Sequence, residues 1–136
     1  MIKKFAVVVL LIFVLVFSGC SENQKIDEVV SYDNFIAYSE SEFNQLKGQE
    51  PVLLFFHADW CGTCKILEDA INENNDQIPE GVTILKVDFD KETELKKEYG
   101  ILLQSMFVVF DKDGDLKEKL AAPSFEDLLI SINSVV

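Results

Sequence analysis

Apolar and polar residues are distributed along the chain in three successive patterns. Residues 5–17 form an unbroken apolar run behind a short basic start, and a polar stretch without strong periodicity follows. From about residue 34 onward, apolar runs typical of strands alternate with stretches in which apolar residues recur at helical spacing. The pattern therefore predicts a leader at residues 1–19, a polar tether at residues 20–33 and a folded domain at residues 34–136.

The domain pattern predicts an α/β fold in which helices separate most of the strands. The expected strands are residues 35–38, 51–57, 82–87, 106–110 and 116–120. The expected helices are residues 39–47, 61–75, 93–99 and a last helix that Ser124 caps. Helices between strands imply parallel crossover connections, whereas the last two strands flank a turn at Gly114 and form an antiparallel hairpin. We therefore expect a mixed sheet covered by helices on both faces.

Two of the expected helices carry an apolar stripe that should pack against the sheet. In the helix of residues 61–75 the stripe comprises Ile66, Leu67, Ala70 and Ile71. In the last helix it comprises Phe125, Leu128, Leu129 and Ile132. Glu68 and Asp69 lie within the first of these helices. They are assigned to its solvent-exposed face, because charged side chains on an amphipathic helix normally face water.

The leader has the composition of a secretory signal. Its apolar run of 13 residues is too short for a permanent transmembrane helix, which takes about 20, and small residues end the run. Residues 16–20, Val-Phe-Ser-Gly-Cys, resemble the bacterial lipoprotein signal, although Phe17 replaces the branched aliphatic residue usual at its position. The resemblance implies cleavage after residue 19 and a lipid on Cys20, with the tether at a membrane surface. An uncleaved anchor and an ordinary cleaved signal remain the alternatives.

The charge balance narrows the class of partner. The chain has 24 acidic and 12 basic residues, contains no arginine and carries a formal net charge of −12. Nucleic acid is therefore not expected as a partner, because no basic patch exists to neutralise its phosphates. The acidic residues are scattered along the sequence, which favours a solubilising surface. An anionic lipid surface would repel such a domain, so a covalent lipid would be useful for holding it at a membrane.

Two of the three cysteines, Cys61 and Cys64, lie close together directly after an apolar run. Such a pair is a redox couple, half of a soft-metal site or two ordinary buried thiols. Cys61 would start a helix, where unpaired N–H groups and the helix dipole stabilise a thiolate, so its pKa should fall below the usual value of about 8.5. Cys64 lies one turn deeper and should be less exposed, with a higher pKa. This asymmetry suits dithiol exchange, in which one sulfur attacks and the other resolves.

The cysteine pair and three later segments resemble the thioredoxin family. These segments are Ala58-Asp59-Trp60-Cys61-Gly62-Thr63-Cys64-Lys65, Lys86-Val87-Asp88, Tyr99-Gly100-Ile101 and residues 107–110. The resemblance covers nearly the whole domain and implies a thioredoxin-like fold, without a cofactor or a resident metal. It implies Cys61 as the nucleophile, Cys64 as the resolving thiol and Trp60 as a platform beside them. The active-site neighbours would be Gly62, Thr63 and Lys65.

Two departures from the family pattern affect the predicted site. The usual cis-proline falls at Ser105, and since a non-proline cis bond costs about 2.5–4 kcal/mol, we expect a trans bond or a shifted loop there. Ser105 is then either a substitute docking residue or an ordinary residue at the start of a strand. Many members place an acid six residues before the first cysteine, where this chain has Phe55. Lys86, the usual partner of that acid, would then lack a carboxylate at that position. His57 would either tune the thiol near neutral pH or simply be packed.

The leading hypothesis is a membrane-tethered thiol–disulfide oxidoreductase outside the cytoplasm, in the cell envelope or periplasm. Cys61 would form a mixed disulfide with exported proteins, and Cys64 would resolve it. By analogy with lipid-anchored relatives we favour reduction, which requires an integral-membrane electron donor, with membrane attachment through lipid on Cys20. A metal-binding or metallochaperone domain that uses the two thiolates of the pair is the alternative. A redox-inactive binding module is the third possibility.

Overall fold

The computed structural model describes residues 34–136. The strands are β1 (Phe35–Ala37), β2 (Val52–His57), β3 (Thr83–Asp88), β4 (Met106–Phe110) and β5 (Leu116–Ala121). The helices are α2 (Glu40–Leu46), α3 (Gly62–Glu73), α4 (Thr93–Tyr99), α5 (Phe125–Val135) and the 3₁₀ helix η1 (Asn75–Gln77). The predicted signal at residues 1–19, the predicted lipidation site Cys20 and the predicted tether at residues 20–33 lie outside the described residues. Within residues 34–136, no helix combines the length and apolar character needed to cross a bilayer.

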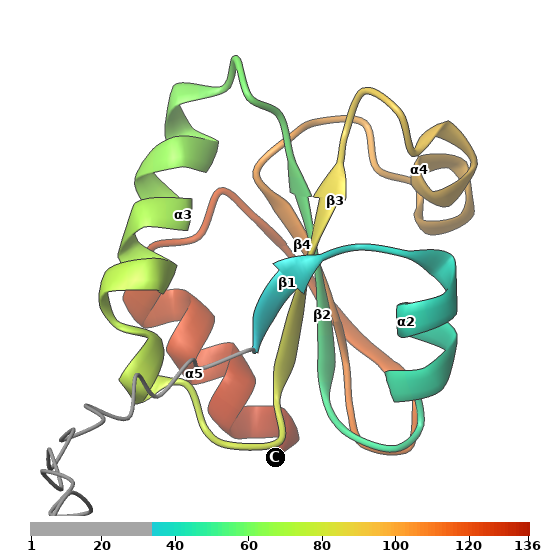
Figure 1. Ribbon diagram of the computed structural model, residues 1–136, viewed down its shortest axis with the longest axis vertical. Helices are drawn as coiled ribbons and strands as arrows, with labels where there is room; N and C mark the ends of the chain where they lie inside the picture. The colour runs from blue at the N-terminus through green and yellow to red at the C-terminus, as the bar shows by residue number, and fades with distance from the viewer. Residues whose placement is uncertain (1–33) are drawn as a thin grey trace, which may run out of the picture. The chain divides into compact units, whose positions relative to one another are not determined.

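The five strands form one mixed sheet in the order β1-β3-β2-β4-β5 (Figure 1). β1 and β2 both run parallel to β3, and β4 runs antiparallel to β2 and β5. The turn between β4 and β5 contains Gly114 with a φ of 83°, a conformation that favours glycine. All six residues of β2 are buried, as expected of a central strand. The predicted mixed sheet and its antiparallel hairpin are confirmed.

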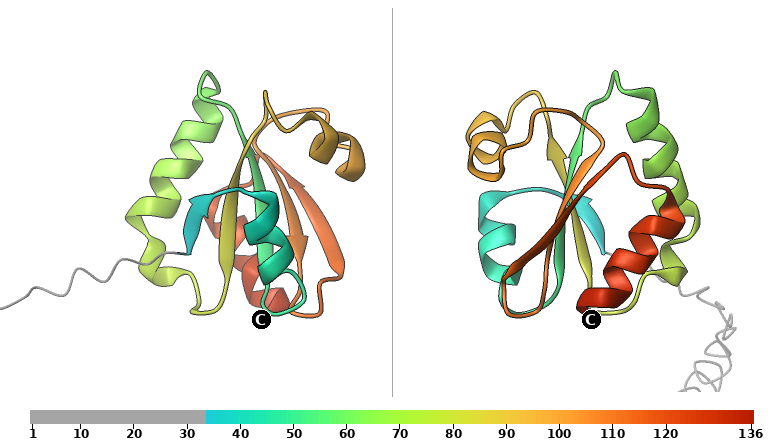
Figure 2. Two further views of the ribbon diagram at one scale, coloured as in Figure 1. Left: turned by 45° about the vertical axis from the view of Figure 1, so that its right-hand side comes forward. Right: turned by 180° about the vertical axis from the view of Figure 1, so that it is seen from behind.

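Helices cover both faces of the sheet, as predicted. α3 and α5 lie on one face and α2 and α4 on the other, and the views in Figure 2 agree on this division. Alternate residues of β2 point to opposite faces, because successive side chains along a strand alternate. Leu53 and Phe55 therefore join the core cluster that includes residues of α3 and α5. Leu54 and Phe56 join the cluster on the opposite face, with residues of α2 and α4.

The apolar stripe predicted for α3 is wrong at Ile66, whose side chain is 72% exposed. The buried residues of this helix are Cys64, Leu67 and Ile71, at positions i, i+3 and i+7. Cys64 therefore belongs to the buried stripe. Compared with the prediction, α3 is rotated about its axis so that Cys64 faces the core and Ile66 faces solvent. The same rotation brings Glu68, one turn after Cys64, to the edge of the side that faces the sheet.

The last helix begins and packs as the sequence predicts. The Ser124 side chain accepts a hydrogen bond from the Asp127 N–H, and the Asp127 carboxylate accepts one from the Ser124 N–H. The two side chains close a capping box that fixes the first turn of α5. Its predicted apolar face is confirmed. Leu128 and Ile132 are buried in the core beside α3, and the flanking residues Phe125 and Leu129 pack against it.

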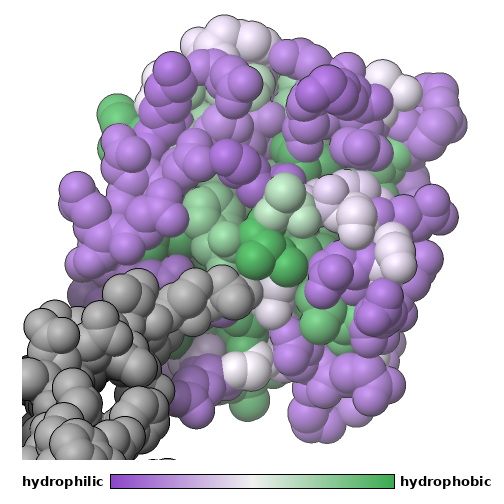
Figure 3. All heavy atoms as spheres, viewed as in Figure 1, coloured by the Kyte–Doolittle hydropathy of each residue, from purple (hydrophilic) through white to green (hydrophobic). Residues whose placement is uncertain are grey.

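The face of the domain shown in Figure 3 is mostly hydrophilic, with a smaller apolar area near its centre. Exposed ion pairs on the domain surface often join near neighbours in the sequence, such as Lys91 with Asp88 and Lys97 with Glu94. Pairs of this kind contribute about 0–1 kcal/mol to stability. The scattered charges therefore act mainly as a solubilising surface, as the sequence predicts.

Candidate active site

The cysteine pair lies where β2 passes into α3. β2 ends at His57, and residues 58–60 turn the chain so that Cys61 is the N-cap of α3. The backbone N–H of Cys61 donates to Ala58 O at 3.0 Å, which closes this turn. In Figure 1 the β2–α3, β3–α4 and α4–β4 connections lie at the same end of the sheet. Residues from all three connections can therefore meet at the pair.

The two sulfur atoms differ in burial and in their contacts. Cys61 keeps 7% of its surface exposed, while Cys64 has none exposed. The backbone N–H of Cys64 donates to Cys61 Sγ at 3.2 Å, so this sulfur is the side-chain acceptor that caps the helix. The two thiols are not joined by a disulfide. The predicted order, with Cys61 nearer the surface and Cys64 beneath it, is confirmed.

The pKa values of the two thiols are shifted in opposite directions. Burial alone would raise the pKa of Cys61, but hydrogen bonds outweigh it, and the pKa is lowered. These bonds come from the side chains of Cys64 and Ser105 and from the backbone of Cys64 and Thr63. Burial is the main cause that raises the pKa of Cys64, and the hydrogen bond with Cys61 raises it further. The directions agree with the asymmetry predicted from the sequence.

Ser105 lies against both sulfur atoms. Its Oγ is 2.9 Å from Cys64 Sγ and 3.5 Å from Cys61 Sγ, and its side chain is buried. Residues 34–136 contain no cis peptide bond, which confirms the trans bond expected at Ser105. Its φ of 59° is left-handed, a conformation that costs a non-glycine residue about 1–2 kcal/mol. Backbone hydrogen bonds to Phe56 O and from the Ala122 N–H hold it there.

An aromatic cluster fills the position at which the family pattern places an acid. Phe55 is fully buried and stacks on Phe107, with ring centroids 4.4 Å apart and planes inclined by 6°. Phe35 lies 6.4 Å from the Phe55 ring, and His57 meets that ring edge-on at 5.4 Å. Phe55 therefore adds apolar packing to the core cluster that contains both cysteines. It supplies no proton acceptor, as the sequence indicates.

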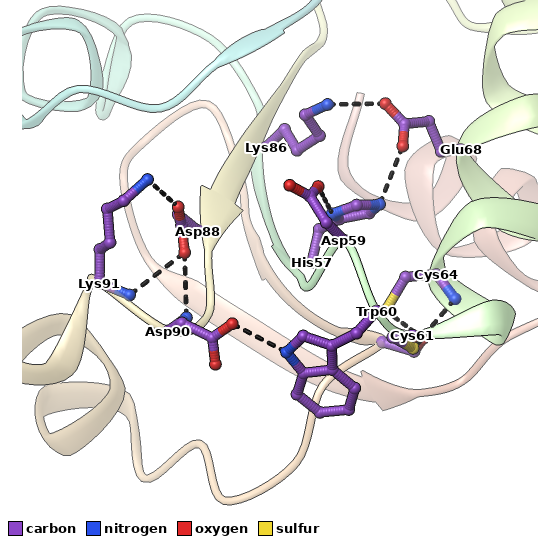
Figure 4. A network of polar contacts seen from close by, with 11 residues as sticks. His57, Asp59, Trp60, Cys61, Cys64, Glu68, Lys86, Asp88, Asp90 and Lys91 are labelled. Carbon is purple, nitrogen blue, oxygen red and sulfur yellow. Dashed lines mark hydrogen bonds and ion pairs between the residues drawn. The ribbon is translucent and has the colours of Figure 1, made fainter.

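A carboxylate from α3 joins a lysine from β3 and a histidine from β2 (Figure 4). Glu68 Oε1 lies 2.7 Å from Lys86 Nζ, and Glu68 Oε2 lies 2.8 Å from His57 Nε2. Lys86 therefore lacks a carboxylate on β2, as expected, and α3 supplies one in its place. The assignment of Glu68 to the solvent-exposed face is wrong, because its side chain is only 23% exposed, whereas Asp69 is exposed as expected. The spacing of four residues from Cys64 to Glu68 is the signal that could have revealed it.

The indole of Trp60 stands beside the pair and is held from a distant loop. Trp60 is 63% exposed, and its Nε1–H donates to Asp90 Oδ2 at 2.8 Å (Figure 4). Asp90 belongs to the β3–α4 connection and was missed in the sequence, because no local pattern links residues 30 positions apart. The predicted neighbours Gly62, Thr63 and Lys65 are exposed around the first turn of α3. Their roles stay predictions.

Exposed apolar side chains and a cavity are two further features of the surroundings of the site. The exposed apolar residues of α3 and its neighbouring connections are Trp60, Ile66, Leu102 and Leu103. A cavity of about 500 Å³ is lined by residues that include Tyr38, His57, Asp59 and Lys86. In the part of the chain that the structure describes, no group of three or more His, Cys, Asp and Glu side chains is arranged to hold a metal ion.

The sequence of the described domain is similar to known thioredoxins. The family model described as Thioredoxin matches residues 34–134. A thioredoxin of Rickettsia felis is 33% identical over 101 residues, which cover 72% of this chain and 95% of that protein. Thioredoxin-1 of Caenorhabditis elegans is 33% identical over 93 residues, which cover 66% of this chain and 79% of that protein.

Solved structures of thioredoxins share the fold. The reduced thioredoxin pre-protein of Schistosoma mansoni has a TM-score of 0.66 at 25% identity, covering 76% of this chain and 99% of that one. The thioredoxin NaTrxh of Nicotiana alata has a TM-score of 0.66 at 26% identity, covering 76% of this chain and 93% of that one. A C-x-x-C pair that caps a helix above a mixed sheet defines a thiol–disulfide oxidoreductase. The chain belongs to the thioredoxin family, and the predicted thioredoxin-like fold is confirmed.

Proposed function

We propose that the protein is a membrane-tethered thiol–disulfide oxidoreductase that works outside the cytoplasm and reduces disulfides in exported proteins. One observation carries the redox part: Cys61 has a lowered pKa at the N-cap of α3, and Cys64 is buried beneath it. The signal-like leader and the cysteine motif at Cys20 support the location and the lipid tether. The tether supplies the membrane attachment, because a chain of net charge −12 is repelled by anionic lipid.

The reaction follows from the different states of the two sulfur atoms. The Cys61 thiolate attacks one sulfur of a substrate disulfide, the substrate S–S bond breaks, and the first substrate sulfur leaves as a thiolate. Cys64 then loses its proton and attacks Cys61 Sγ. The Cys61–Cys64 disulfide forms, and the second substrate sulfur leaves as a thiolate. Two electrons have passed to the substrate, so an integral-membrane donor must return two electrons to the pair.

The surroundings of the pair suit a polypeptide substrate. Ser105 Oγ lies within hydrogen-bond distance of both sulfur atoms, so its hydroxyl can donate to whichever sulfur carries charge. The exposed indole of Trp60 offers a large apolar surface next to Cys61, and its bond to Asp90 keeps it from moving away. Together these groups would hold a mixed disulfide while the resolving thiol attacks.

Trapping in intact cells tests the proposal. Cys64→Ala removes the resolving sulfur, so mixed disulfides on Cys61 should accumulate and survive acid quenching and blocking of free thiols. They should be recovered in the membrane fraction, and mass spectrometry should identify exported proteins that contain disulfides. The matched control is the double variant Cys61→Ser/Cys64→Ala, which keeps the fold and the tether but should yield no adduct.

The outcomes separate the redox function from its location. If no adduct depends on Cys61, the oxidoreductase function itself is overturned. If adducts depend on Cys61 but contain only cytoplasmic proteins, the location is overturned and the redox function stands. Replacing Cys20 with Ser should release the trapped protein from the membrane fraction, and retention there would contradict the lipid tether.

A further inference from the structure

The resolving step of the proposed function, on which this inference rests, requires a proton acceptor. Cys64 is fully buried, and burial is the main cause that raises the pKa of its thiol. At neutral pH it therefore holds its proton, which must leave before the sulfur attacks Cys61. Ser105 Oγ lies 2.9 Å from Cys64 Sγ, but a hydroxyl is too weakly basic to keep a proton. Another group must accept it.

Strand β2 has no acid at Phe55, but the neighbouring helix α3 carries a carboxylate. Glu68 follows Cys64 by four residues, and residues four apart lie on the same face of a helix. Its two carboxylate oxygens contact Lys86 Nζ at 2.7 Å and His57 Nε2 at 2.8 Å. Glu68 is thus tied to two strands of the sheet, one helical turn from the resolving thiol (Figure 4).

His57 connects the Glu68–Lys86 ion pair to the end of β2, where the segment that carries the cysteine pair begins. Its side chain is only 4% exposed, and within the described residues its Nε2 makes no hydrogen bond of good geometry, although Glu68 Oε2 is close. The next residue, Ala58, contacts the Cys64 thiol through a backbone hydrogen bond. The His57 ring also meets Phe55, which belongs to the same core cluster as Cys64. A buried imidazole without an aligned partner, next in sequence to a residue that contacts the buried thiol, is suited to proton transfer.

The network also reaches solvent. The cavity of about 500 Å³ is lined by His57 and Lys86 among other residues, so a proton taken up there can pass to water. The ionisable groups that face His57 come from α3, β3 and the β2–α3 connection. They are Glu68, then Lys86 and Asp88, and finally Asp59, whose Oδ1 lies 3.8 Å from His57 Nδ1.

We propose that His57 and Glu68 together act as the proton acceptor for Cys64, in place of an acid on β2. As Cys64 Sγ attacks Cys61 Sγ, the Cys64 proton passes to the His57–Glu68 pair. The Cys61–Cys64 bond forms, and the bond from Cys61 to the substrate sulfur breaks. The substrate sulfur leaves as a thiolate and takes a proton from solvent. The His57–Glu68 pair returns its proton to water in the cavity, and Lys86 holds Glu68 in position.

Single-turnover kinetics on the reduced full-length protein separate the two chemical steps. The probe is glutathione disulfide with a dye on each half, which releases one labelled thiol on attack by Cys61 and the other on resolution by Cys64. A Cys20→Ser background leaves the pair as the only thiols. The decisive variant is Glu68→Gln. Its matched control is Asp69→Asn, which removes the same charge from the next, exposed position of α3.

Glu68→Gln should leave the first phase nearly unchanged and slow the second phase by about tenfold or more at pH 7, as expected on loss of a positioned base. Its second-phase rate should keep rising to higher pH, because hydroxide must then take the proton. Asp69→Asn should change neither phase. His57→Phe should slow the second phase, and its combination with Glu68→Gln should add little, since the two groups act as a unit.

Two results would overturn the proposal. One is a second-phase rate that is the same in Glu68→Gln and Asp69→Asn. The other is equal slowing of both phases, which a purely structural role would cause. If thermal unfolding shows that Glu68→Gln does not fold, His57→Phe decides between the same outcomes. Absence of a Cys61-dependent first phase in the parent protein would instead show that the proposed function fails.

Discussion

At the scale of single residues, Ser105 is the side chain that both sulfur atoms share. Its hydroxyl is 2.9 Å from Cys64 Sγ and 3.5 Å from Cys61 Sγ, and its hydrogen bonds lower the pKa of each thiol against the effect of burial. The backbone at Ser105 is left-handed, a conformation that the neighbouring strands must hold in place. The residue is therefore more than an ordinary start to β4.

Ser105→Ala should make Cys61 a weaker acid. The thiolate loses a donor while burial, which opposes ionisation, is unchanged, so the midpoint of alkylation against pH should move to higher pH. At pH 7 the rate of Cys61 alkylation should fall by about tenfold, the effect of losing roughly 1.5 kcal/mol from a hydrogen bond to a charged group. Mass spectrometry after timed iodoacetamide treatment measures the rate. Ser134→Ala, at an exposed position of α5, should leave the midpoint in place, and an unmoved midpoint in Ser105→Ala would refute the assignment.

The residues that the sequence predicted are those whose role depends on local pattern. Cys61 and Cys64 were predicted because an apolar strand that leads into a C-x-x-C motif fixes both the helix start and their order of burial. Asp90 was missed, since its bond to Trp60 joins segments that are far apart in the sequence. Local spacing specifies which side chains share a helix face, but it does not specify the partner across a loop.

At the scale of elements, the orientation of α3 about its axis depends on whether Cys64 is counted among its apolar residues. Its buried stripe runs through Cys64, Leu67 and Ile71, so a neutral cysteine counts as an apolar residue for packing. The prediction left Cys64 out of the stripe and therefore placed Ile66 in the core and Glu68 in water. The strands and the helix starts were predicted well, because caps and buried runs are local. Only the packing of α3 on the sheet decides its rotation.

The neighbouring residues Leu67 and Ile66 should respond in opposite ways to truncation. Leu67→Ala should lower the free energy of unfolding by about 2–5 kcal/mol, because it opens a cavity beneath a fully packed helix. Ile66→Ala should change it by no more than about 0.5 kcal/mol, since most of that side chain is exposed. Urea unfolding followed by circular dichroism measures both. Similar losses for the two variants would show that α3 is rotated differently from the arrangement described.

At the scale of the whole molecule, the direction of electron flow depends on the balance between two forms of the pair. Hydrogen bonds to Cys61 Sγ stabilise the thiolate and so favour the reduced form, which makes the protein a better oxidant. Full burial of Cys64 opposes ionisation of the second thiol and leaves only one charge in the reduced form. The burial of Cys64 therefore limits how far the reduced form is stabilised. A less stable reduced form gives up its electrons more readily, which is consistent with a reductase.

The reduction potential should accordingly lie near or below that of the glutathione pool, at about −220 to −260 mV. Equilibration of the Cys20→Ser protein with glutathione or dithiothreitol buffers, followed by alkylation and mass spectrometry, gives the value. Ser105→Ala should move it further negative by about 30 mV, because loss of roughly 1.5 kcal/mol from the reduced form favours the disulfide. A potential near −120 mV, that of a strong oxidant, would reverse the proposed direction. In that case the integral-membrane partner must accept electrons from the pair, and the trapped proteins would be substrates for disulfide formation.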